Sequence, residues 1–235
     1  MVKRSKGYNE ALKILEENKE YSPAEAVAIA KKAVHTKFDE SVELHLRMGV
    51  DPRNPNQQVR GVALLPHGLG KKVRVLVFAQ GEGEKIAKEA GADFYGGDEL
   101  VKKIEGGWTD FDTAISTPEM MPKVGKLGKV LGRKGLMPNP KAGTVVKAED
   151  LARVIEDASK GRVEYKLDRT AIIHVTVGKA SFEEDKLNDN LMALLDAVVK
   201  ARPSSVKGQY IKSGYICTTM GPGIKLDLKS TLAAA

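Results

Sequence analysis

The spacing of hydrophobic residues changes twice along the chain, and this change constrains the fold more than any other feature. Over residues 38–65, and again after Gly161, apolar and polar residues alternate with a period of two, which is typical of half-buried antiparallel strands. Between these stretches, continuous apolar runs alternate with amphipathic helical segments, which is typical of a parallel sheet covered by helices. The pattern therefore predicts an α+β domain built from both ends of the chain, with an α/β domain inserted into it.

The expected domain limits lie where the pattern breaks. We place the α+β domain at residues 1–67 and 160–235, and the inserted domain at residues 68–159. The chain would cross between the domains near residues 66–70 and 159–161, a geometry that permits a hinge. One continuous mixed sheet is the alternative.

The α+β domain is expected to contain helices before its first strand. The second helix begins at Ser22-Pro23-Ala24-Glu25, a capping box with proline in the first turn. Strands are expected over residues 38–50 and 58–65, and the loop between them predicts that they pair with each other in antiparallel fashion. Near the other end, Ser181-Phe182-Glu183-Glu184 would cap a long helix, and residues 210–219 would form a last strand.

Alternating strands and helices are expected in the inserted domain. The predicted strands cover residues 73–78, 93–95 and 113–116, and the predicted helices cover residues 82–90, 98–105, a segment from Pro118 onward, and 148–159.

The cysteine and histidine content gives no sign of an enzyme. Cys217 is the sole cysteine, which excludes an internal disulfide and zinc or iron–sulfur sites built from cysteines. The sequence also lacks a nucleophile motif. The histidines His35, His45, His67 and His174 follow no metal-binding spacing. We therefore expect no catalytic residue, no metal and no cofactor.

A nucleotide-binding enzyme is the main alternative, because the inserted domain alternates strands and helices. Gly81-Glu82-Gly83 lacks the third glycine of a dinucleotide-binding loop. Gly68-Leu69-Gly70-Lys71-Lys72 precedes the first parallel strand and lacks the Ser or Thr of a phosphate loop. Turn and hinge positions explain both glycine groups better.

Positive charge indicates a polyanionic partner. The chain has 38 Lys and Arg against 31 Asp and Glu, a formal net charge of +7. Residues 121–148 contain basic residues and no acidic ones, and their glycines and prolines favour an irregular backbone that could follow a polyanion. A solvated basic face is the alternative. The basic residues of this segment are Lys123, Lys126, Lys129, Arg133, Lys134, Lys141 and Lys147.

The end of the last predicted strand has the composition of a contact surface. The hydroxyls of Thr218 and Thr219 would donate to phosphate or ribose oxygens, Met220 would supply an apolar pad, and Gly221 would permit close approach. Lys37-Phe38, at the start of the first strand, adds a cation and an aromatic ring. An ordinary turn is the alternative for residues 218–223.

Several motifs, in order along essentially the whole chain, resemble the bacterial large-subunit ribosomal protein L-one family. The longest is Leu131-Gly132-Arg133-Lys134-Gly135-Leu136-Met137-Pro138-Asn139-Pro140-Lys141. The others are Val59-Arg60-Gly61, Leu65-Pro66-His67-Gly68, Ile172-Ile173-His174, Val177-Gly178-Lys179 and residues 218–221. Two positions depart from the family pattern: Arg133 replaces a proline, and Leu167 replaces an asparagine.

The resemblance implies a two-layer α+β domain and an inserted Rossmann-like α/β domain on a hinge, without enzymatic activity. Proteins of this family bind large-subunit rRNA at the mobile lateral stalk and contact deacylated exit-site tRNA, whose release they assist. They commonly repress translation of their own operon mRNA through the same surface. A non-ribosomal RNA chaperone or regulator is the weaker alternative.

The same resemblance implies a cytoplasmic protein on the large ribosomal subunit, monomeric off the ribosome and without a membrane partner. The sequence fits this expectation. The basic N-terminus is followed by no apolar stretch of a secretory signal, and no apolar run approaches the roughly 20 residues of a spanning helix.

Carried over by position, the resemblance implies a principal RNA face and a secondary contact. Lys, Ser and Thr would bind phosphates and 2′-hydroxyls, Phe38 and Met220 would pack on sugars or bases, and Asp168 would accept from RNA donors. The principal face would consist of Lys37, Phe38, Ser41, Lys166, Asp168, Ser181, Thr219, Met220 and Gly221. The secondary contact would consist of Lys123, Lys126, Lys129, Arg133, Lys134 and Lys141.

Overall fold

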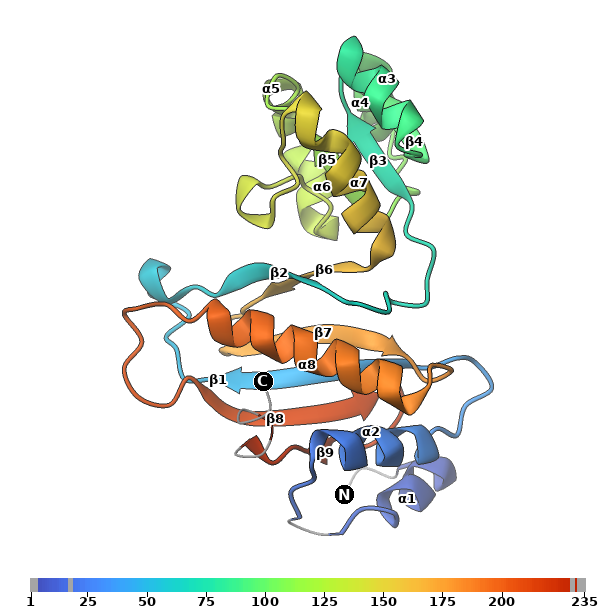
Figure 1. Cartoon of the computed structure of the whole chain (residues 1–235), viewed down its shortest axis with the longest axis vertical. Helices are drawn as coiled ribbons and strands as arrows, with labels where there is room; N and C mark the ends of the chain where they lie inside the picture. The colour runs from blue at the N-terminus through green and yellow to red at the C-terminus, as the bar shows by residue number, and fades with distance from the viewer. Residues whose placement is uncertain (1–3, 17–18, 229–230, 232–235) are drawn as a thin grey trace. The chain divides into compact units, whose positions relative to one another are not determined.

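The computed structural model describes residues 4–16, 19–228 and 231. The chain forms two compact units (Figure 1). The outer unit comprises Met1–Gly70 with Val163–Ala235, and the inserted unit comprises Lys71–Arg162. The fold class expected from the sequence, α+β together with α/β, is confirmed. The domain limits after residue 67 and before residue 160 stay a prediction.

A four-stranded sheet of order β7-β1-β8-β9 forms the centre of the outer unit. Its strands are β1 (Ser41–Met48), β7 (Ile172–Lys179), β8 (Ile211–Thr218) and β9 (Ile224–Lys225), of which β9 was not expected from the sequence. β1 is antiparallel to both of its neighbours. Val42, Leu44, Leu46 and Met48 are buried, whereas the residues between them are exposed or half-buried, so the predicted alternation is confirmed.

Helices cover one face of this sheet. α8 (Glu184–Lys200) lies in front of β7 and β1 in Figure 1, and its leucines join the same hydrophobic core as alanines of α2 (Pro23–Lys32). α1 (Lys6–Leu12) precedes them. The side chains of β1, β7 and β8 that point away from these helices form what we call the open face.

The predicted capping box at the start of α2 is confirmed. The Ser22 hydroxyl accepts from the Glu25 N–H, and the Glu25 carboxylate accepts from the Ser22 N–H at 3.1 Å. These bonds satisfy two N–H groups that the helix itself leaves without partners. The predicted cap of α8 is wrong. α8 begins after Glu183, whose side chain makes no capping bond within the described part of the chain, and the Ser181 hydroxyl is bound to Asp39 instead.

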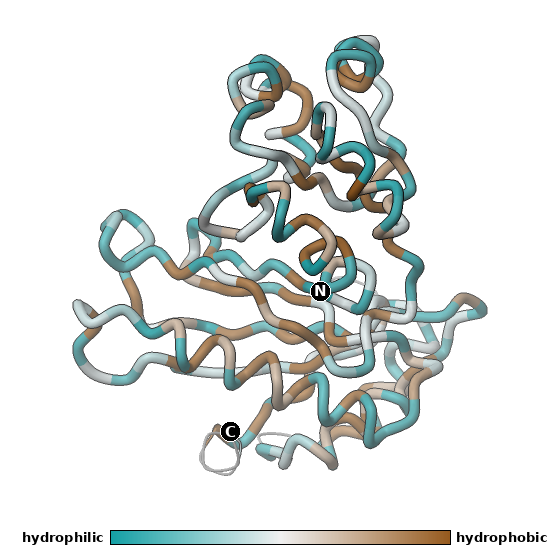
Figure 2. The backbone as a smooth tube through the Cα atoms, turned by 45° about the horizontal axis from the view of Figure 1, so that its top comes forward, coloured by the Kyte–Doolittle hydropathy of each residue, from teal (hydrophilic) through white to brown (hydrophobic). Residues whose placement is uncertain are grey.

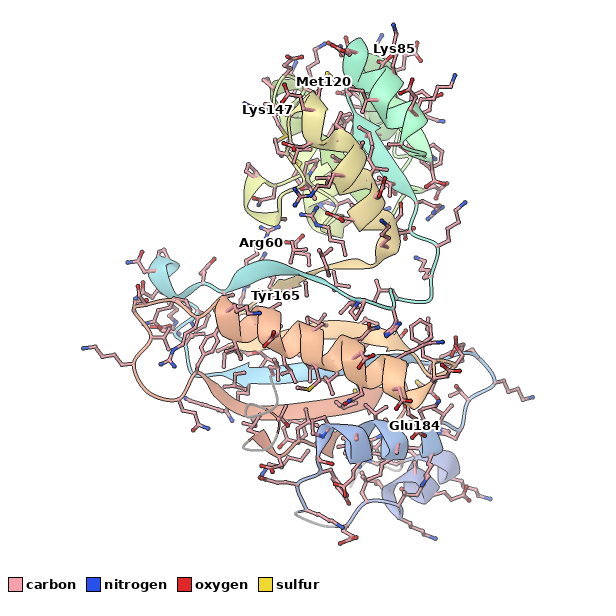
Figure 3. All side chains as sticks on the ribbon, in the orientation of Figure 1. Arg60, Lys85, Met120, Lys147, Tyr165 and Glu184 are labelled. Carbon is pink, nitrogen blue, oxygen red and sulfur yellow. The ribbon has the colours of Figure 1, made fainter. Side chains whose placement is uncertain are left out.

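The predicted pairing of the first two strands is also wrong. β2 (Arg60–Leu64) forms a two-stranded sheet with β6 (Arg162–Lys166), because β7 and β8 occupy both edges of β1. Figure 3 labels Arg60 and Tyr165 on this pair. Arg60 bonds to the Glu164 carboxylate at 2.5 Å, and the Tyr165 hydroxyl donates to the Ala197 carbonyl of α8 at 2.9 Å. The loop before β2 contains one short 3₁₀ helix, Pro55–Gln57.

The inserted unit is a parallel three-stranded sheet with helices on both faces. The strand order is β4-β3-β5, with β3 (Val75–Phe78) in the centre and fully buried between β4 (Phe94–Gly96) and β5 (Thr113–Ser116). α4 (Asp98–Glu105), α5 (Met121–Val124) and α6 (Gly128–Lys134) pack on one side, whereas α3 (Glu82–Glu89) and α7 (Leu151–Lys160) pack on the other. Figure 2 shows hydrophobic residues along the strands and hydrophilic ones in many loops.

Glycine marks two helix ends in this unit. Gly135 follows α6 with φ +72°, and Gly161 follows α7 with φ +117°, both in the left-handed region that favours glycine. The helix predicted from Pro118 onward is present as α5 and α6, with a 3₁₀ turn, Gly125–Leu127, between them. The irregular backbone that the glycines and prolines predicted follows Lys134. Two further 3₁₀ turns, Pro140–Ala142 and Ala148–Asp150, precede α7. Among the described residues, no helix has the length and apolarity of a membrane span.

Candidate nucleic-acid interface

The loop before β1 and the turn after β8 are joined by hydrogen bonds at one end of the outer sheet. The Ser41 N–H donates to the Thr219 hydroxyl oxygen at 3.0 Å, and the Thr219 N–H donates to the Ser41 carbonyl at 3.0 Å. Both residues belong to the predicted RNA face. The pairing of β1 with β8 therefore places Ser41 next to Thr219, although the two residues are far apart in the sequence.

Buried Glu40 connects the loop before β1 to the turn after β8. Its carboxylate accepts from the Thr36 hydroxyl at 2.8 Å and from the Met220 N–H at 3.1 Å, and its carbonyl accepts from the Ala180 N–H at 2.8 Å. Burial opposes ionisation, but the adjacent Thr218 hydroxyl and the hydrogen bonds from the Met220 N–H and the Thr36 hydroxyl lower the pKa of Glu40. An ionised carboxylate beneath the surface thus fixes the path of both segments.

Thr218 corrects one expectation. Its side chain is buried and faces Glu40, so its hydroxyl belongs to the interior and not to a contact surface. Thr219 is exposed, but its hydroxyl already accepts from the Ser41 N–H and donates to the Ser41 carbonyl. The Thr219 hydroxyl therefore links the turn after β8 to the start of β1.

The turn between β7 and α8 joins the same surface. Lys179 donates to the Ser41 hydroxyl at 2.9 Å and to the Asp39 carbonyl at 3.3 Å. The Ser181 N–H and hydroxyl both donate to the Asp39 carboxylate, at 3.1 Å and 2.8 Å. Lys179 was not among the predicted site residues, although the Gly178-Lys179 turn was part of a family motif.

Two large apolar side chains are exposed on this hydrogen-bonded framework. Phe38 is 54% exposed and Met220 is 53% exposed. The Phe38 carbonyl accepts from the Thr36 hydroxyl at 3.1 Å, and the Met220 N–H donates to Glu40, so the backbones of both residues are held. Lys37 is exposed beside Phe38. We call the residues at this end of the outer sheet the strand-end surface. It consists of Lys37, Phe38, Ser41, Ser181, Thr219, Met220 and Gly221, seven of the nine residues of the predicted principal face.

Lys166 and Asp168 lie at the other end of β1. Ser41 is opposite Lys179 and Arg47 is opposite Ile172, so about 20 Å of strand separates the two groups. Lys166 and Asp168 line a cavity of about 470 Å³. Its other lining residues are Pro52, Gln58, Leu167 and Arg169.

Asp168 has an internal role that the sequence did not reveal. Its carboxylate accepts from the N–H groups of Thr170 and Ile172, at 2.8 Å and 2.7 Å, and from the Thr170 hydroxyl at 2.5 Å. Burial opposes ionisation, but these bonds lower the pKa of Asp168. Much of its capacity to accept hydrogen bonds is thus used to shape the turn before β7.

The open face connects the two groups. Between them, β1 presents Glu43, His45 and Arg47 on the side away from the helices. Arg47 is exposed, and together with exposed Arg169 it adds cations that the carried-over positions did not include. The alternation along β1, which already assigned Arg47 to the polar side, was a signal that could have found it.

Most cations of the predicted secondary contact lie in the helical segment 121–134 of the inserted unit. Lys126, Lys129 and Arg133 are spaced three and four residues apart and exposed, opposite buried Leu127 and Leu131. The other predicted cations differ. Lys123 forms an ion pair with Asp98 at 2.6 Å, Lys134 is exposed but donates to the Thr109 hydroxyl, and the side chain of Lys141 lies outside the described residues.

Comparison with known proteins identifies the family. Residues 29–222 match the model of the Ribosomal protein L1p/L10e family. The chain belongs to this family. A protein of Dehalococcoides mccartyi named large ribosomal subunit protein uL1 is 64% identical over 233 residues, covering 99% of this chain and 98% of the relative. A protein of the same name from Thermomicrobium roseum is 52% identical over 236 residues, covering 100% and 98%.

The predicted resemblance is thereby confirmed. Proteins of the L1p/L10e family are structural ribosomal proteins and not enzymes. The match to the L1p/L10e model covers both the strand-end surface and the exposed cations Lys126, Lys129 and Arg133.

A crevice in the inserted unit is the place where a nucleotide would bind if the chain were a nucleotide-binding enzyme. It lies at the carboxyl ends of β3 and β5, where open α/β sheets bind ligands, and has a volume of about 560 Å³. Glu82 and Glu119 both line it, against one cation, Lys147, which Figure 3 labels. Two carboxylates and one ammonium disfavour a nucleotide phosphate.

Proposed function

We propose that this chain is a structural protein of the large ribosomal subunit that binds large-subunit rRNA at the mobile lateral stalk, in the cytoplasm. Family membership supports the class of partner. The observation that carries the proposal is the exposure of Phe38 and Met220, at 54% and 53%, on a hydrogen-bonded framework. Exposed apolar groups with fixed backbones provide a preformed seat for folded RNA.

The chemistry of the strand-end surface fits recognition of RNA shape. Phe38 and Met220 would pack against bases or sugars, and Lys37 would contact phosphates. The oxygens of Ser181 and Thr219 would accept from 2′-hydroxyls, since their protons are used within the protein. Because the surface is organised before binding, little conformational entropy is lost on association.

Lys166, Arg169 and the open face would extend the contact along β1. Arg47 and Arg169 would meet phosphates, and Asp168 would hold the turn that positions Lys166 and Arg169. The inserted unit would add a second, mainly electrostatic contact through Lys126, Lys129 and Arg133.

Two finer functions follow as proposals from the same reasoning. The inserted unit, joined to the outer unit at two chain crossings, would contact exit-site tRNA and assist its release. The strand-end surface would also bind a similar element in the mRNA of the chain's own operon and repress its translation. Both RNAs would then compete for one surface, which a competition binding assay would test directly.

Binding of a stalk rRNA fragment to purified variants tests the principal face. We expect Met220→Asp to weaken binding by about 1–3 kcal/mol, because an apolar contact is replaced by a charge that repels phosphate. Thr219→Val removes the joint to Ser41 and should weaken binding in the same range. Val199→Asp places the same charge at an exposed apolar position of α8 and serves as the control. Unchanged affinity in both test variants would refute the assigned surface.

Two further assays separate this proposal from the alternatives. Equilibrium dialysis with ATP or NAD should show no specific uptake, whereas a nucleotide-binding enzyme would retain one of them. Sedimentation with large subunits should recover the chain in the subunit fraction, whereas a non-ribosomal RNA chaperone would remain in the supernatant.

A further inference from the structure

Three side chains of different chemistry converge on the open face. In the register of β1 and β8, Glu43 is directly opposite Cys217, and His45 follows two residues along the same side of β1. His45 Nε2 lies 3.0 Å from Cys217 Sγ and 3.8 Å from a Glu43 carboxylate oxygen. The three ligand atoms lie within 4.8 Å of one another, the one such grouping in the described part of the chain.

A second histidine supports the orientation of the first. His45 Nδ1 lies 2.8 Å from His174 Nδ1 on β7, and His174 Nε2 lies 3.7 Å from the Asp168 carboxylate. A proton on His45 Nδ1 can be donated to His174, which leaves the lone pair of His45 Nε2 directed toward Cys217 and Glu43. Histidines that bind metals commonly have their second nitrogen fixed in this way.

The spacing suits a small tetrahedral cation. With zinc–ligand bonds of about 2.0–2.3 Å, the ligand atoms of a tetrahedral site are about 3.3–3.8 Å apart. The separations of 3.0 Å and 3.8 Å from His45 Nε2 lie close to this range, and the Cys217 and Glu43 ligand atoms lie within 4.8 Å of each other. Sulfur, imidazole nitrogen and carboxylate oxygen are the ligand types that Zn²⁺ uses in proteins.

We propose that Glu43, His45 and Cys217 form a zinc-binding site on the open face of the outer sheet, with a solvent molecule as the fourth ligand. Binding breaks the S–H bond of Cys217, forms a Zn–S bond and releases the proton to solvent. The metal would link β1 to β8, two residues from Ser41 and two residues from Thr219, both of the strand-end surface. The site does not depend on the proposed RNA binding.

Cobalt titration of the reduced, metal-free full-length chain tests the site, because Co²⁺ reports its ligands by absorption. We expect a near-ultraviolet thiolate-to-cobalt charge-transfer band and intense visible bands of tetrahedral cobalt, both removed by added Zn²⁺. Cys217→Ser should abolish the charge-transfer band, and His45→Gln and Glu43→Gln should each weaken binding at least tenfold. His35→Gln and His67→Gln, outside the cluster, should behave as the parent.

A second measurement covers variants that fold poorly. In the parent chain, Zn²⁺ should slow the reaction of Cys217 with a thiol reagent and raise the thermal unfolding midpoint. Circular dichroism establishes that each variant is folded before titration. The proposal is overturned if the parent shows no charge-transfer band and no Zn²⁺ protection of its thiol, or if the band survives in Cys217→Ser.

Discussion

Glu40 shapes an exposed surface without contacting solvent itself. Its carboxylate accepts from Thr36 and Met220, so the positions of Phe38 and Met220 depend on a group that RNA does not reach. An ionised acceptor of backbone N–H groups forms stronger hydrogen bonds than a neutral one. The geometry of the strand-end surface is therefore linked to the ionisation of one buried carboxyl group.

The first prediction concerns the pH dependence of Glu40. Hydrogen bonds lower its folded-state pKa below the ordinary 4.5, so it stabilises the fold above about pH 4.5, and this contribution disappears as the pH falls through the lower folded-state value. Glu40→Gln should lower the free energy of unfolding by about 1–3 kcal/mol at pH 7. The difference from the parent should shrink below pH 4.5.

Urea unfolding at several pH values between 3 and 7 checks this expectation. Glu10→Gln, at an exposed position of α1, is the control and should leave the free energy of unfolding nearly unchanged at every pH. A constant difference between Glu40→Gln and the parent across the whole range would contradict the assigned ionisation.

The second prediction concerns Gly221. A Cβ at this position would overlap the buried Thr218 hydroxyl, whereas a Cβ at Gly223, in the same turn, would make an ordinary contact 3.8 Å from Tyr215. Gly221→Ala should therefore displace Thr218 or the turn and destabilise the chain by about 1–3 kcal/mol. It should also weaken rRNA binding. Gly223→Ala should leave both stability and RNA affinity near those of the parent, and equal effects of the two substitutions would argue against this account.

At the scale of elements, the cations of the helical segment 121–134 differ in whether a carboxylate neutralises them. Lys126, Lys129 and Arg133 are exposed on one side, whereas Lys123 is paired with Asp98. Replacing Lys126, Lys129 and Arg133 by Gln should reduce the slope of log Kobs against log salt by about 2–3 if each meets a phosphate. Binding to stalk rRNA at a series of salt concentrations measures this slope.

Lys123→Gln is the matched control for this series. Because its charge is already neutralised locally by Asp98, its loss should change the salt dependence much less than that of any of the other three. A slope unchanged in the triple variant would remove Lys126, Lys129 and Arg133 from the RNA interface.

Local sequence patterns predicted the elements, but pairing across the fold escaped them. Ser22 and Glu25 lie three residues apart, so the capping box was visible, and the alternation from Val42 to Met48 was equally local. The partner of β2 was not visible, because the strands that occupy both edges of β1 lie more than a hundred residues away. The same limit concealed the cluster of Glu43, His45 and Cys217, whose members meet only through strand register.

The candidate site shows the same division. Family motifs supplied the strand-end surface, but sequence could not separate side chains that face outward from those bound within the protein. Thr218 is buried against Glu40, and Asp168 is committed to its turn. Both outcomes depend on backbone N–H groups and hydroxyls whose directions are set only once the strands have paired.

For the whole molecule, each unit has hydrophobic cores of its own. The outer core groups residues of α2, α8 and the four-stranded sheet, and the cores of the inserted unit flank β3 on its two faces. Replacing residues 71–162 by a flexible Gly-Ser linker should therefore leave an outer unit that unfolds cooperatively. It should retain most of the affinity for stalk rRNA, because the strand-end surface lies in the outer unit.

Calorimetry and rRNA binding check this prediction. The shortened chain should lose the part of the salt dependence that comes from Lys126, Lys129 and Arg133 while keeping its sensitivity to Met220→Asp. A shortened chain that folds but binds no rRNA would place the principal contact outside the strand-end surface.

The central position of β1 also affects how the chain folds as it is made. β1 leaves the synthesising ribosome early, yet both of its partners, β7 and β8, come after the entire inserted unit. At about 5–20 residues per second, the 41–48 strand waits roughly 10–30 s for residue 218. Until β7 is complete at residue 179, neither edge has its native partner, and the second edge waits for β8. The inserted unit, whose own strands are complete by residue 116, can already fold in this time. In a nascent chain, the inserted unit should thus fold before the outer unit. The unpaired edges of β1 should need protection from aggregation until β8 has emerged.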